Sequence, residues 1–233
     1  MVIYFTCLTY QAGAQIYTRP LNLPKLDRKP YHFGFHISYN TMNFGLRPID
    51  NPVLVDSVYS IETKRGSGFS MGIMMNVRMN DFFSFRVIPT LSFGSRSLVY
   101  TFKGINDSVF FQQTKRVEST YLELPLLIRY RSARLNNIRA LIEIGGKYSF
   151  DLSSKAGLDD KGETLVKLKK HDLSFEMGVG MDFYLPYFKF SPVFRVSWGV
   201  PNVLYREDHE FSNSINRLYT RMIMLSLFFE GSL

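Results

Sequence analysis

The chain of 233 residues has a single cysteine and, after its first residues, no run of 18 apolar residues. The cysteine, Cys7, lies in an apolar leader that ends in Ala12-Gly13-Ala14, a small-residue cleavage pattern. We therefore predict a signal peptide at residues 1–14, with a buried first strand as the alternative. The mature chain would then have no thiol, no disulfide and no cysteine metal site. The lack of long apolar runs argues against membrane-spanning helices.

Two-residue alternation is the strongest pattern in the chain, and it is clearest over residues 173–200. Large apolar side chains occupy every second position, and small or charged ones occupy the positions between them, as in a strand with two unlike faces. No helical or second β-layer is evident that could bury the apolar face. The apolar face is therefore predicted to contact lipid, and the charged face to line the lumen of a transmembrane barrel.

The same stretch predicts a hairpin folded about Leu185-Pro186. That register sets Asp182 opposite Lys189 and Glu176 opposite Arg195. Opposite charges facing each other across two strands stabilise a hairpin by about 0.2–1 kcal/mol a pair.

Similar alternation recurs from Tyr31 onward and predicts eight strands joined by connections of alternating length. The long connections are expected at residues 46–67, 103–117, 151–172 and 201–218, and the short ones at Asn80-Asp81, Arg134 and Leu185-Pro186. Outer-membrane barrels have an even number of strands, short periplasmic turns and long outer loops. We therefore predict an all-β fold, an eight-stranded antiparallel transmembrane β-barrel over residues 31–233, in the cell outer membrane. Residues 15–30 are expected to form a periplasmic N-terminal segment resembling a solvated linker.

Eight strands leave an interior that side chains fill, so no open pore is expected. Inward charges must be paired, because an isolated charge is costly in a low-dielectric interior. Three prolines inside strands, Pro89, Pro125 and Pro192, are expected to form bulges. The predicted lumen charge network comprises Arg86, Glu123, Arg129, Glu143, Lys147, Glu176, Asp182, Lys189 and Arg195.

Two motifs invite a chemical interpretation, and the sequence favours a structural one for both. His32, His36 and Ser38 share the lumen face of the first strand, but no carboxylate is placed to orient the imidazole as a catalytic triad requires. Residues 159–163 are acidic but lack the alternating ligands of a calcium loop. We therefore predict a protein that is not an enzyme and has no metal site and no cofactor.

The formal net charge is +8, and much of the excess lies near the short turns. Contact with lipid headgroups is one interpretation of this basic rim. The other is docking of an acidic periplasmic partner at Arg78, Arg131, Arg134 and Arg139, with residues 15–30 as a second contact. Nucleic-acid binding is disfavoured because the aromatic residues lie on the lipid face, away from the basic stripe.

Three segments resemble the small outer-membrane β-barrel proteins of Bacteroidota: STYLELPLLIRYR at Ser119–Arg131, GGKYSFDLS at Gly145–Ser153 and FEMGVGMDF at Phe175–Phe183. The opening of the barrel, at Tyr31–Pro48, looks most like the PorT family, called SprT in gliding relatives. This resemblance implies an outer-membrane component of the type IX secretion system. That system exports proteases, adhesins and other cargo with C-terminal signal domains. The family supplies no catalytic residues.

The residues and the resemblance together favour a non-enzymatic barrel that serves type IX secretion through partner proteins. Its expected partners are the outer-membrane bilayer and other secretion components, with no nucleic acid and no small-molecule substrate. An independent structural or adhesive barrel of the OmpA or OmpX type is the main alternative. A lipid-modifying barrel enzyme is the second alternative.

Overall fold

The computed structural model describes residues 20–48, 58–103, 110–154, 168–205 and 215–231. The predicted signal peptide with Cys7 and the acidic stretch at residues 159–163 lie outside these ranges. The described residues form a short 3-10 helix, η1 (Leu26–Arg28), and the strands β1 (Tyr31–Pro48), β2 (Val58–Lys64), β3 (Gly66–Arg78), β4 (Phe83–Val87), β5 (Thr90–Lys103), β6 (Phe110–Arg131), β7 (Ile138–Asp151), β8 (His171–Tyr184), β9 (Phe188–Gly199) and β10 (Ile215–Gly231).

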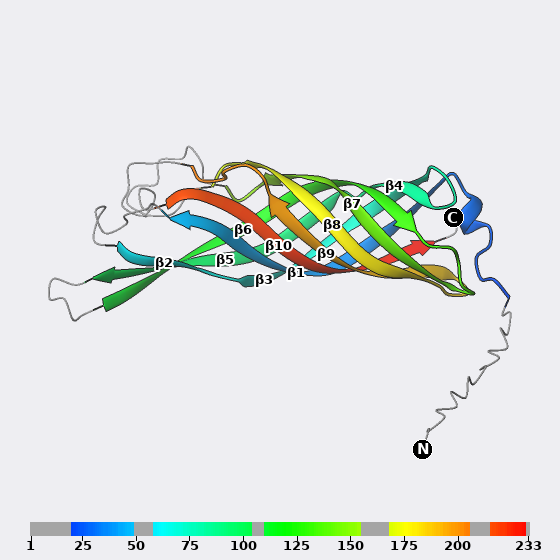
Figure 1. Cartoon of the computed structure of the whole chain (residues 1–233), viewed down its shortest axis with the longest axis horizontal. Helices are drawn as coiled ribbons and strands as arrows, with labels where there is room; N and C mark the ends of the chain where they lie inside the picture. Colours follow the sequence, from blue (N-terminus) through cyan, green and yellow to red (C-terminus); the bar gives the residue numbers. More distant parts are fainter. Residues whose placement is uncertain (1–19, 49–57, 104–109, 155–167, 206–214, 232–233) are drawn as a thin grey trace, which may run out of the picture.

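The strands form one antiparallel sheet that closes on itself (Figure 1). Strand β1 pairs with β10 on one side and with β3 on the other, so the first and last strands complete the ring. Closure pairs the strands of the ring on both sides, which is why a barrel is stable where backbone groups have no water to bond, whereas β2 pairs with β5 alone. The all-β transmembrane barrel predicted from the alternation is confirmed.

The described residues contain ten strand elements where the sequence predicted eight strands. One expected strand is divided in two, because residues 88–89 separate β4 from β5, and β2 is an additional strand inside the expected loop at residues 46–67. Both β4 and β5 pair with β3 on one side and β6 on the other. The halves therefore follow one another along the same position in the ring, and the additional elements do not change the barrel class.

The predicted hairpin register is wrong by two residues. Lys189 lies opposite Tyr184, and Arg195 lies opposite Gly178. The cause is the turn, in which the amide of Leu185 donates to the carbonyl of Phe188 over 3.0 Å. Pro186 is then the first central residue of the turn, the position that its fixed φ favours. A shift of two residues keeps every side chain on its predicted face, whereas a shift of one would have exchanged the faces.

The three strand prolines do not form the predicted bulges. The register to β3 is the same before and after Pro89, and the pairings through Pro125 and Pro192 continue without a shift. Proline removes only an N–H donor and keeps its carbonyl acceptor. The amide of Ile73 accordingly donates to the carbonyl of Pro89, and that of Ile88 to Pro125.

The outer end of the barrel extends further than predicted, so the bounds of three expected long loops are wrong. β1 continues to Pro48, and β2, β6 and β10 begin inside those loops. The prediction assumed polar residues inside, but at this end the inside is apolar and the alternation is inverted. The apolar cluster comprises Phe44, Leu98, Tyr100, Phe102, Leu168, Val203, Leu204, Ile215 and Leu218, all buried. The paired ends of β5 and β6 project with β2 at the left of Figure 1.

The outer wall of the barrel carries the apolar half of the alternation. Phe175, Phe194 and Leu225 are 44–49% exposed, whereas their neighbours Glu176 and Arg195 are at most 1% exposed. This arrangement suits lipid outside and a charged interior. Among the described residues, no helix is both long and apolar enough to cross a membrane.

Candidate functional site

The barrel interior holds a dense set of charged side chains. The structure places all nine residues of the predicted network there, and none is more than 3% exposed. A tenth charge, Glu230 at the end of β10, lies among them and is fully buried. With Glu230 the set contains five cations and five carboxylates, so its formal charges balance.

Glu230 joins several of these groups and was missed by the sequence analysis. One carboxylate oxygen lies 2.5 Å from Lys189 Nζ and 2.5 Å from His32 Nε2, and the other accepts a hydrogen bond from Arg86. The signal was available in the sequence, because the outward residues of the last strand have odd numbers and Glu230 therefore faces inward. The nine predicted charges also left one cation in excess, which a further carboxylate would balance.

Arg129 links three strands in the centre of the interior. Its Nε and Nη2 atoms donate to Glu143 of β7 over 3.1 and 2.9 Å, and its Nη1 atom donates to Asp182 of β8 over 3.2 Å. Asp182 also accepts a hydrogen bond from Ser191 Oγ at 2.5 Å. The planar guanidinium suits such multiple contacts, so Arg129 fixes the relative position of β6, β7 and β8.

Two further ion pairs lie along the interior. Lys147 Nζ is 2.8 Å from Glu123, and Arg195 Nη1 is 2.8 Å from Glu176. The predicted attraction between Glu176 and Arg195 thus exists as a diagonal contact, since these residues are not directly opposite. Both ion pairs are buried, and breaking either one would leave an unpaired charge in the interior.

The ring of Phe228 lies among three guanidinium groups. The Cζ atoms of Arg86, Arg129 and Arg195 are 5.1, 5.8 and 5.3 Å from its centroid. The ring is fully buried, so it fills the space between these cations and attracts them through its π face. With the apolar cluster at the outer end, these side chains fill the lumen.

His36 and Ser38 of β1 have hydroxyl partners, whereas His32 of the same strand contacts the carboxylate of Glu230. His36 Nδ1 lies 3.0 Å from Ser38 Oγ, and His36 Nε2 lies 2.9 Å from Thr90 Oγ1. Ser38 Oγ in turn donates to Ser226 at 2.8 Å. The partners that orient a triad imidazole are carboxylates, and these are hydroxyls. No cluster of three or more potential metal ligands occurs within the described parts of the chain.

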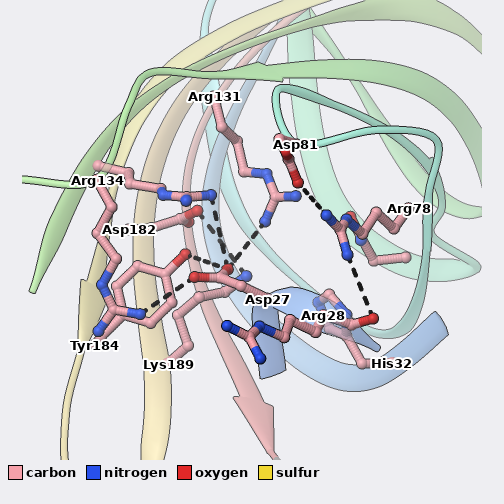
Figure 2. A network of polar contacts seen from close by, with 12 residues as sticks. Asp27, Arg28, His32, Arg78, Asp81, Arg131, Arg134, Asp182, Tyr184 and Lys189 are labelled. Atoms are coloured by element: carbon pink, nitrogen blue, oxygen red, sulfur yellow. Dashed lines mark hydrogen bonds and ion pairs between the residues drawn. The ribbon is translucent and has the colours of Figure 1, made fainter. Parts of the chain in front are cut away.

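The short-turn end of the barrel carries an arginine cluster, Arg131, Arg134 and Arg139, around one carboxylate, that of Asp27 (Figure 2). Their Nη1 atoms lie 3.5, 3.1 and 3.7 Å from the Asp27 oxygens. The hydroxyl of Tyr184 donates to the same carboxylate at 2.7 Å. Three of the four residues predicted for partner contact therefore hold a residue of the chain's own N-terminal segment.

Residues 20–30 lie against the barrel end, in contrast to the solvated linker that was expected. The amide of Asn22 donates to Asn137 Oδ1 at 2.9 Å, and the Asn22 side chain donates to the carbonyl of Tyr184 at 2.9 Å. The fourth predicted contact residue, Arg78, pairs with Asp81 and donates through its backbone amide to Pro30 at 2.7 Å. Prolines spaced along the segment suggested a linker, but its polar groups form hydrogen bonds and ion pairs with residues at the short-turn end of the barrel.

Comparison with known proteins gives one family and several similar folds. Residues 14–205 match the family model described as outer membrane protein beta-barrel domain. No curated protein matches the chain. The crystal structure of Neisserial surface protein A is similar with a TM-score of 0.43 and 10% identity, over 88% of this chain and 100% of that one. The outer membrane protein OprG from Pseudomonas aeruginosa has a TM-score of 0.42 and 11% identity, over 86% and 94%. The attachment invasion locus protein Ail of Yersinia pestis, in complex with the heparin analogue sucrose octasulfate, has a TM-score of 0.37 and 11% identity, over 87% and 99%.

Proposed function

The chain belongs to the outer membrane protein beta-barrel domain family, and from that premise we propose that it is a closed, non-enzymatic component of type IX protein secretion. In this role it does not conduct the cargo. It holds or assembles other secretion proteins at the outer membrane, through its periplasmic and outer surfaces.

The filled lumen is the observation that carries this proposal. Ten paired charges, the ring of Phe228 and the apolar cluster at the outer end occupy the interior of the barrel. Opening a passage for a polypeptide would separate these buried ion pairs and leave charges in the barrel without their partners, which is unfavourable. A barrel of this kind acts through its surfaces.

The assignment to type IX secretion is supported by the resemblance of Ser119–Arg131 and Tyr31–Pro48 to the PorT family. A deletion strain tests it through the export of a cargo protein that bears a C-terminal signal domain. We expect cargo to accumulate inside the cell while a periplasmic marker enzyme stays in the periplasm. The wild-type gene should restore export. Normal export in the deletion strain would refute the role.

Partner contact is proposed at Arg78, Arg131, Arg134 and Arg139, since short barrel turns face the periplasm. The positive charge of this end is complementary to the negative charge of an acidic periplasmic protein. Reversing Arg131 and Arg134 to Glu should remove the associated protein from an affinity capture in mild detergent. The matched control reverses Arg65 and Arg116, which are exposed and lie toward the opposite end. Equal capture by both variants would refute the contact, and heat-modified migration on gels shows that each barrel has folded.

A second candidate is an independent adhesive barrel of the OmpA or OmpX type. The observation that favours it is the extension of β5 and β6, which pair as far as Lys103 and Phe110 and carry strand structure beyond the rest of the wall. Such a projection offers backbone and side chains to outside ligands. Normal cargo export together with lost surface attachment in the deletion strain would select this candidate.

A further inference from the structure

The N-terminal segment places an apolar and an acidic residue side by side at the short-turn end. Leu26 is 2% exposed, and the neighbouring Asp27 is held by three arginines and by Tyr184. Both residues belong to η1, a helix of only three residues. The end of the barrel thus accommodates a short apolar–acidic pair in a tight turn.

The cations of this site outnumber its anions. Three guanidinium groups face Asp27, the one carboxylate within ion-pair distance of them in the described chain. Arg134 also lies over the ring of Tyr184, with its Cζ atom 3.8 Å from the centroid. The stacked guanidinium and the tyrosine hydroxyl form a rigid receptor for a carboxylate. The remaining positive charge favours a ligand with a second acidic group.

The segment is separate from the sheet that closes the barrel. Ring pairing begins at Tyr31, which lies opposite Val77, and residues 20–30 are held mainly by side chains. The segment can therefore leave its site while every strand pairing of the ring remains. Figure 2 shows the side chains of Arg131, Arg134 and Tyr184 gathered around Asp27.

We propose that the arginine cluster and Tyr184 form a peptide-binding site, which Leu26 and Asp27 occupy in cis. Its ligand in trans is an acidic segment of a periplasmic protein, in which an apolar residue directly precedes a pair of carboxylates. The proposal rests on the partner contact proposed above for the same arginines. A tethered segment acts at an effective concentration on the order of millimolar, so a free peptide with the identical sequence competes poorly. A ligand with two carboxylates would neutralise more of the positive charge of the three arginines than Asp27 does with one.

The test measures binding of two labelled peptides to the full-length barrel in neutral detergent. One peptide carries residues 20–30 of the chain, and the other is the same peptide with Arg28→Asp. We expect the Arg28→Asp peptide to bind the Asp27→Asn barrel at least about tenfold more tightly than the wild-type barrel. The reason is that a neutral amide in place of the Asp27 carboxylate weakens the contact of the chain's own segment with the arginines and so reduces its competition with the peptide. The matched control is Asp81→Asn, which removes a carboxylate from the same end but outside the arginine cluster, and it should bind like the wild type. Adding Arg134→Gln to Asp27→Asn should remove the gain.

The outcomes separate this proposal from the proposed function. Absent binding to the Asp27→Asn barrel, or equal binding to all variants, would overturn the peptide site. So would binding that is seen in neutral detergent and vanishes in vesicles with anionic lipid, since the arginines would then serve lipid headgroups. Defective cargo export in the deletion strain would leave the secretion role standing in each of these cases. If the peptide binds the variants as expected but the deletion strain exports cargo normally, the peptide site would stand and the secretion role would be refuted.

Discussion

Replacing Glu230 by Gln removes one negative charge from the barrel interior with almost no change of shape. The Glu230 side chain is fully buried and contacts Lys189, His32 and Arg86. Arg129 Nη1 lies 3.9 Å from it. The substitution leaves five cations facing four carboxylates among buried side chains. Breaking a buried ion pair by neutralising one partner costs about 3–5 kcal/mol, and we expect the free energy of unfolding to fall by that amount.

Unfolding by denaturant in phospholipid vesicles measures the change, with the fluorescence of Trp198, the chain's one tryptophan, as the signal. Glu118→Gln is the matched control, because Glu118 is an exposed partner of Arg116 at 3.4 Å. An exposed pair of this kind contributes less than about 1 kcal/mol. Lys189→Met in the Glu230→Gln background restores the balance of charge and should recover part of the loss, which a double-mutant cycle detects. Equal stability of Glu230→Gln and Glu118→Gln would refute the interior network as a source of stability.

Three further predictions concern the wall and the lumen. Gly145→Ala should lower the free energy of unfolding by about 1–3 kcal/mol, because its Cβ would clash with the backbone carbonyl oxygen of Leu126. The adjacent Gly146→Ala meets no atom within 4 Å and should be neutral in the same denaturation assay. Leu225→Arg on the lipid-facing side of β10 should reduce the equilibrium stability in vesicles by about 2–4 kcal/mol, and an unchanged midpoint would contradict its outward position. In planar bilayers the purified protein should show no stepwise conductance, whereas regular steps would contradict the filled lumen.

The faces of the strands could be predicted from the sequence, but the details of their pairing could not. Alternation depends only on the parity of residue numbers, so it separates Phe194 from Arg195 whatever the register. The pairing of β8 with β9 depends on which residues form the turn. The sequence does not distinguish a turn on Leu185-Pro186 from one on Pro186-Tyr187, and the two-residue error followed.

Two regions differ from prediction for a different reason. At the outer end, Leu98 and Tyr100 face inward and pack on apolar residues, so a pattern with polar residues inside did not extend there. At the other end, the contacts of Asp27 join residues more than 100 positions apart in the chain. No local pattern signals such contacts, and the prolines of the segment suggested a linker. Glu230 has an even number, as inward-facing residues of the last strand do, so the alternation alone was enough to predict its inward position.

The central claim is that alternate residues face lipid and a charged interior, and quenching by brominated lipids tests it most directly. Phe194→Trp in a Trp198→Phe background places a single indole on the outer wall, at a position 47% exposed in the structure. We expect bromines near the bilayer centre to quench its fluorescence strongly, while a water-soluble quencher has little effect. If brominated lipid does not quench the fluorescence, position 194 lies in a dry protein core, which would contradict the transmembrane barrel.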